Sequence, residues 1–139
     1  MHAASHVSME VHAEFERIGR LELRRLADEL LGDPDPVVVD RSVRFVLAET
    51  RGLWHGRARA KICRRLKHHG LGRAHRDLLV ACILRRLSTG AFSEQFKDQL
   101  RLAMQLDPGR AAEAGTACLS SPKPHVRRYA RWVLGHADG

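Results

Sequence analysis

Apolar residues recur at helical spacing along almost the whole chain, whereas the alternation of a strand is absent. The most regular stripe consists of Val126, Tyr129, Ala130, Val133 and Leu134, at i, i+3, i+4, i+7 and i+8. Glycine and proline interrupt the pattern at short intervals, so it predicts helices of ordinary length. Seven helical segments are expected, at about residues 8–31, 36–49, 53–69, 73–88, 93–107, 110–120 and 124–136.

The residues at the segment boundaries suggest how some of these helices begin and end. Gly19 is expected to bend or break the first segment. Asp35 is a candidate N-cap with Pro36 in the first turn behind it, and Ser93 is a candidate N-cap of the fifth segment. The fourth segment is apolar without interruption over residues 78–84, which predicts a helix surrounded by other helices.

Seven helices with short connections predict an all-α fold. The second, fourth and sixth segments open near residues 36, 73 and 110, an interval within the range of two-helix solenoid repeats. An irregular bundle of helices of average length fits the same interval. The fold class is therefore an all-α helix-hairpin solenoid or an irregular helical bundle of about seven helices.

Residues 119–135 carry a pattern of a leucine, a proline turn, Val-Arg, an alanine and Leu-Gly, at Leu119, Pro122, Pro124, Val126, Arg127, Ala130, Leu134 and Gly135. This segment resembles the first helix of a HEAT repeat, and residues 31–47 share the pattern more loosely. The resemblance implies stacked helix hairpins with a continuous core. Leu47 and Leu134, however, lie in segments an odd number of helices apart, so both cannot hold the same place in a strict two-helix register.

The length of 139 residues fits a single domain over 1–139, with residues 1–8 expected to be flexible. Neither a membrane-spanning run nor a signal-peptide core is present, so the cytoplasm is the expected compartment. Cys63, Cys82 and Cys118 are odd in number and far apart, which favours small core residues over disulfides or a zinc site.

Charge is distributed unevenly around a net charge of +8. Residues 1–50 hold ten acids and six bases, whereas residues 51–139 hold six acids and eighteen bases. Nine bases and no acid lie within residues 51–76. Most of the 24 bases are arginine, a bacterial-type bias that genome composition alone can produce. Such a split points to a polyanion or to an acidic protein face as the partner.

Two groups of residues are therefore candidate binding residues. On a helical wheel the first forms a basic ridge, and it contains Arg57, Lys61, Arg64, Arg65 and His68, followed by Arg73 and Arg76. The second lies in the last segment and contains Arg127, Arg128, Arg131 and Trp132, the last of which lies off the apolar stripe. Acids of the N-terminal half that fold onto the ridge and neutralise it are the alternative explanation.

No catalytic, cofactor or metal signature emerges, so a non-catalytic binding module or adaptor is predicted, without cofactor or metal. Its expected partner is nucleic acid or an acidic protein surface, with no membrane contact; self-assembly into a homo-oligomer is a further alternative. Some DNA glycosylases for alkylated bases are also HEAT-like and basic. That remote alternative has only Asp77 as a candidate acid beside the ridge.

Overall fold

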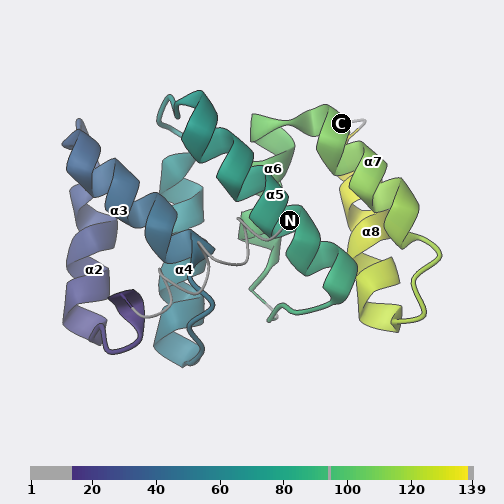
Figure 1. Cartoon of the computed structure of the whole chain (residues 1–139), viewed down its shortest axis with the longest axis horizontal. Helices are drawn as coiled ribbons and strands as arrows, with labels where there is room; N and C mark the ends of the chain where they lie inside the picture. Colours follow the sequence, from purple (N-terminus) through teal and green to yellow (C-terminus); the bar gives the residue numbers. More distant parts are fainter. Residues whose placement is uncertain (1–13, 94, 138–139) are drawn as a thin grey trace.

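The computed structural model describes residues 14–93 and 95–137, and within them the chain is all-helical (Figure 1). The helices are α2 (Arg20–Glu29), α3 (Pro36–Leu47), α4 (Leu53–Leu66), α5 (Arg73–Thr89), α6 (Lys97–Leu106), α7 (Pro108–Cys118) and α8 (Pro124–Ala137). The predicted all-α fold is thereby confirmed. Two expectations lie outside the described residues. They are the flexibility of residues 1–8 and the first part of the helical segment expected over residues 8–31.

The helices alternate between two layers. One layer contains α2, α4, α6 and α8, each beside the next, and the other contains α3, α5 and α7 (Figure 1). Consecutive helices also pack as three hairpins, α3/α4, α5/α6 and α7/α8, with α2 beside the first hairpin. The hairpins begin at residues 36, 73 and 108, close to the predicted 36, 73 and 110. This arrangement is compatible with a helical repeat.

The two segments with a shared sequence pattern belong to different layers. Leu47 ends α3, whereas Leu134 lies in α8. The mismatch in register that the sequence indicates is therefore a real feature of the fold. The similarity of the two segments reflects how a proline-initiated amphipathic helix packs, and it does not mark equivalent places in successive hairpins.

Helix α5 is the central element, as its apolar run predicts. It packs against α3, α6, α7 and α8, and Leu79, Ile83 and Leu87 are fully buried. Its run is not covered all round, because Leu78 remains 37% exposed. Of the cysteines, Cys63 and Cys118 are buried and Cys82 is partly buried against the core. Burial raises the pKa of the Cys63 thiol to about 12, so this thiol is inert at neutral pH.

The start of α3 agrees with the prediction, whereas the start of α6 does not. Asp35 Oδ1 accepts a hydrogen bond from Val37 N at 2.8 Å, with Pro36 in the first turn. Gly19 breaks the first segment, because it has extended backbone and α2 starts after it. The cap predicted at Ser93 is wrong: α6 begins at Lys97, with no side-chain cap. The reason is that the ring of Phe92 stacks on that of Phe96 at 4.3 Å, directly before the helix begins.

Within residues 14–93 and 95–137, every helix is too short or too polar to span a lipid bilayer.

Gly90, which ends α5, is required by both backbone conformation and space. Its φ is +77°, and a Cβ there would lie 2.8 Å from His125 Nε2. We expect Gly90→Ala to lower the free energy of unfolding by at least about 1–2 kcal/mol, the cost of the left-handed conformation alone. Gly70→Ala is the matched control, because nothing lies within 4 Å of the new Cβ. Urea unfolding of both variants measures the difference, and equal midpoints would contradict the prediction.

Candidate anion-binding surface and pocket

The predicted ridge forms the outward side of α4. This helix buries Ala60, Ile62, Cys63 and Leu66 against the core, so the opposite side of the helix faces solvent. On the outward side Arg57, Arg64 and His68 are exposed, whereas Lys61 and Arg65 are half-buried. These side chains share one direction because their spacing in the sequence places them on one side of the helix, as predicted.

The structure brings the two predicted clusters into one layer. Helix α8, with Arg128 and Arg131 exposed, lies in the same layer as α4, and α6 lies between them. Helix α6 supplies two further exposed cations, Lys97 and Arg101. We call this surface the basic face and define it by Arg57, Lys61, Arg64, Arg65, His68, Lys97, Arg101, Arg128 and Arg131. Lys97 and Arg101 escape sequence analysis because only the packing of α6 brings them between the clusters.

Trp132 and Arg127 are already engaged within the protein. The half-buried Trp132 ring has Lys97 Nζ at 5.4 Å and Arg101 Cζ at 5.2 Å from its centre, and the ring of His136 lies 4.4 Å away. Arg127 is half-buried and donates to the backbone oxygen of Ser121 at 2.7 Å. The tryptophan thus packs against α6 and against His136 of its own helix.

Acids neutralise only part of the basic face. Arg65 pairs with Asp28 at 3.2 Å, and Arg64 pairs with Asp98 at 2.7 Å. Arg57 and Lys61 have no carboxylate partner among the described residues. Of the acids in residues 14–29, Asp28 alone reaches the ridge, since Glu14 pairs with Arg44 and Glu22 with Arg41 of α3. The fold therefore leaves the face positive.

Arg73 and Arg76 are not brought to this face. They lie in the first turn of α5, which belongs to the other layer. Both approach Asp77, at 3.8 Å and 3.9 Å respectively, and that carboxylate is more than half exposed. The candidate acid of the glycosylase alternative thus lies on a solvated helix start between two arginines.

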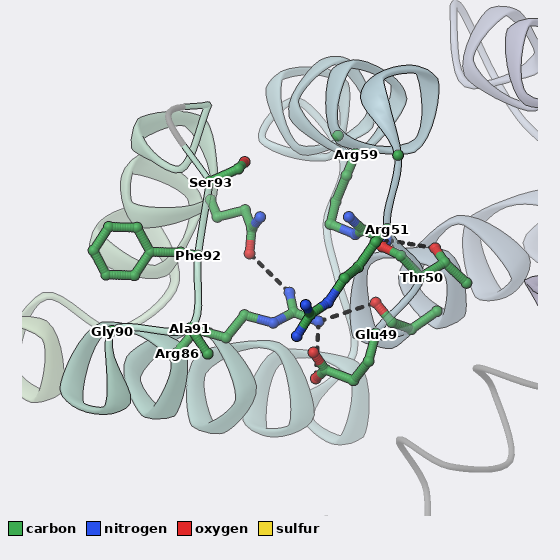
Figure 2. Close-up of a pocket in the computed structure, with 13 residues that line it drawn as sticks. Glu49, Thr50, Arg51, Arg59, Arg86, Gly90, Ala91, Phe92 and Ser93 are labelled. Carbon is green, nitrogen blue, oxygen red and sulfur yellow. Dashed lines mark hydrogen bonds and ion pairs between the residues drawn. The ribbon is translucent and has the colours of Figure 1, made fainter.

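A separate pocket of about 480 Å³ opens between the first and second hairpins (Figure 2). Its walls come from the α3–α4 loop, the start of α4, the end of α5 and the α5–α6 loop. Three arginines, Arg51, Arg59 and Arg86, line it together with Glu49 as the one acid among the described lining residues. Arg59 and Arg86 are only 8% and 6% exposed, so the pocket holds two buried guanidinium groups.

The two buried arginines differ in how fully they are bonded. Arg86 donates to Gln99 Oε1 at 2.8 Å, to the backbone oxygens of Leu47 and Ala48 at 3.2 Å, and to Glu49 Oε1 at 3.3 Å. It therefore caps the C-terminus of α3, where carbonyls lack helical partners.

Arg59 uses only one of its nitrogens. Its Nη2 donates to the backbone oxygen of Thr50 at 3.0 Å and to Thr50 Oγ1 at 2.7 Å, whereas its buried Nε has no partner among the described residues. Burial, and secondly the charge of Arg86, lower the pKa of Arg59 to about 10. The guanidinium remains charged at neutral pH, in surroundings that penalise the charge.

Sequence analysis missed the pocket, although a signal for it exists. Arg59 precedes Ile62, Cys63 and Leu66 by three, four and seven residues, so it lies on the apolar stripe. Arg86 follows Ile83 by three residues in the same way. A base on the buried stripe indicates an arginine with a specific internal partner, rather than a member of a solvated ridge.

Two histidines, His55 in α4 and His69 just after it, bond to segments that are distant in sequence. His55 Nε2 donates to the backbone oxygen of Ile18 at 3.3 Å, and its Nδ1 lies 2.8 Å from Thr50 Oγ1. His69 Nε2 donates to the backbone oxygen of Leu30 at 2.8 Å. Among the residues with described positions, no group of three or more potential ligands could hold a metal ion.

Comparison of the chain with protein-family models, with curated proteins and with solved structures gives no significant match. The functional argument therefore rests on the geometry of the face and the pocket.

His55 gives the fold a pH dependence that can be tested. Burial lowers its pKa from 6.5, partly opposed by the bond to Ile18. As the pH falls, the unfolded chain takes up this proton first, so stability decreases below pH 6.5. We expect His55→Gln to lose less stability than the wild type between about pH 7 and pH 5, by at most about 1.4 kcal/mol per pH unit.

The exposed His68, replaced by glutamine, is the control, and urea unfolding at each pH measures the slope. Identical slopes in all three proteins would contradict the assignment.

Proposed function

We propose that this protein is a non-catalytic, HEAT-like binding module that holds a polyanion, in the first place nucleic acid, along its basic face. The observation that carries the proposal is that the predicted bases of α4 and α8 lie in one helix layer, with Lys97 and Arg101 of α6 between them. The helices α2, α4, α6 and α8 carry thirteen lysines and arginines against four acids. Helices α3, α5 and α7 carry seven against three.

The spacing of these cations suits a chain of phosphates. Arg57, Lys61 and Arg64 follow one another about one turn apart on α4, which gives a row of charges along the helix. Further rows follow on α6 and α8 across the layer. Rows of lysine and arginine with little acid between them favour contact with a phosphate backbone, which binds by charge rather than by base sequence.

The engagement of Trp132 with α6 favours backbone contacts over base stacking. Binding to an acidic protein surface is the second possibility for the same face, and self-assembly of the acidic N-terminal part with this face is the third. The cytoplasm is the compartment that we assign in this proposal, because the three cysteines are free.

We expect the wild type to bind fluorescent single- or double-stranded oligonucleotides at about 50 mM salt and to lose affinity steeply toward about 200 mM. Arg57→Ala/Lys61→Ala removes two cations from the outward side of α4, neither of which has a carboxylate partner among the described residues. This double variant should flatten the slope of log K against log salt by about 1.4 to 1.8, the contribution of two phosphate contacts. Fluorescence anisotropy at several salt concentrations measures both quantities.

The matched control is Arg73→Ala/Arg76→Ala, which removes the same charge from α5 in the other layer. It should leave the slope unchanged. Equal loss in both double variants would mean that net charge alone drives binding, and it would contradict the proposed face. If the wild type binds no oligonucleotide at low salt, the nucleic-acid proposal fails. Retention of one acidic protein by the wild type but not by the α4 variant would then identify the second possibility.

A further inference from the structure

The pocket between the first two hairpins contains more positive charge than its own residues compensate. Arg51, Arg59 and Arg86 face one carboxylate, that of Glu49, which leaves a net charge of +2 among the described lining residues. Buried charges in proteins are ordinarily paired, because transfer of an unpaired ion out of water is expensive. Arg86 is paired with Glu49, but the buried Arg59 bonds only to Thr50 and has no carboxylate partner among the described residues. This unpaired buried charge points to an anion that completes the site.

Arg59 is the group with bonding capacity to spare. Its side chain is more than nine-tenths buried, and its Nε–H is without a partner in the described protein. Arg86, in contrast, is held by four acceptors and fixes the end of α3. Arg51 is exposed on the α3–α4 loop and extends toward the two buried arginines (Figure 2). The site thus combines a fixed, buried donor with a surface arginine that can close over a ligand.

The walls allow a ligand to approach the backbone closely. Gly52, Gly56 and Gly90 line the pocket, and Gly52 has a φ of +125° that L-residues rarely adopt. Helix α4 starts directly after Gly52 without a side-chain cap, so its first amide groups have no side-chain acceptor. The Phe92 ring points away from the arginines (Figure 2) and stacks on Phe96, which leaves the pocket without an aromatic surface for a base.

We propose that this pocket binds a dianionic phosphate group, whose oxygens accept hydrogen bonds from Arg59 and Arg51. A phosphate monoester carries nearly two negative charges at neutral pH, which matches the net charge of the lining, whereas a single carboxylate leaves half of that charge unpaired. A guanidinium group offers two parallel N–H donors to two oxygens of one phosphate. A volume of about 480 Å³ also leaves room for a substituent on the phosphate. This site is distinct from the basic face and adds to the proposed function.

Calorimetric titration at constant ionic strength tests the site, with inorganic phosphate, phenyl phosphate and acetate as probes. We expect saturable binding of the two phosphates and none of acetate. Tighter binding of phenyl phosphate would identify a monoester, and equal or weaker binding of it would identify free phosphate. Arg59→Met should weaken phosphate binding at least about tenfold, because a hydrogen bond to a charged group is lost.

Arg51→Gln keeps the proposal testable if Arg59→Met does not fold, because Arg51 is exposed and its replacement leaves the core intact. It should also weaken phosphate binding. Arg110→Gln is the control and should bind phosphate like the wild type, because Arg110 is exposed on α7 and does not line the pocket. Wild-type affinity in Arg51→Gln or in a folded Arg59→Met, or no saturable binding by the wild type, would overturn the proposal. If the basic face does not bind nucleic acid, the oligonucleotide assay would show this, and phosphate binding at the pocket would be unaffected.

Discussion

The burial of α5 between its neighbours is the constraint on which the other features depend. Its apolar residues cannot be covered by its own hairpin alone, so hairpins must stack on both sides of it. When the hairpins stack in line, the second helix of each hairpin lies in the same layer. The outward sides of α4, α6 and α8 then lie side by side, and charges that are far apart in sequence form one surface. The basic face is thus a consequence of how the core is buried.

The same stacking creates two junctions between hairpins, and they are closed differently. At the second junction Lys123 Nζ donates to the backbone oxygen of Thr89 at 2.6 Å, and His125 Nε2 to that of Gly90 at 3.1 Å. These side chains fill the space so tightly that position 90 has no room for a Cβ. At the first junction, Arg59 and Arg86 lie between the hairpins, and a pocket remains beside them. The second junction is therefore bonded from within the chain, whereas at the first the buried Nε of Arg59 has no partner among the described residues.

Much of the fold could be predicted from the sequence, because helical phase and proline-initiated starts are local properties. The hairpin starts, the Asp35 cap and the outward direction of Arg57 and Arg64 all follow from spacing. What could not be predicted depends on contacts distant in sequence. Residues 51–76 look like a single basic run, yet packing divides it among the outward side of α4, the pocket and the start of α5. The start of α6 was also missed, since aromatic stacking in its loop overrides the capping preference of Ser93.

Ion pairing acts differently at the two candidate sites. On the basic face the pairs of Arg64 and Arg65 each have one exposed member, Arg64 and Asp28 respectively. Ion pairs in contact with solvent contribute at most about 1 kcal/mol each, so a polyanion can displace them at little cost. In the pocket, water cannot screen the charge of Arg59 in this way, and its lowered pKa reflects that cost in the free protein. An anion bound there removes a penalty that the fold already carries, whereas an anion on the face only exchanges one partner for another. Binding at the pocket should therefore depend less on salt than binding at the face, because its interactions are buried and screened less.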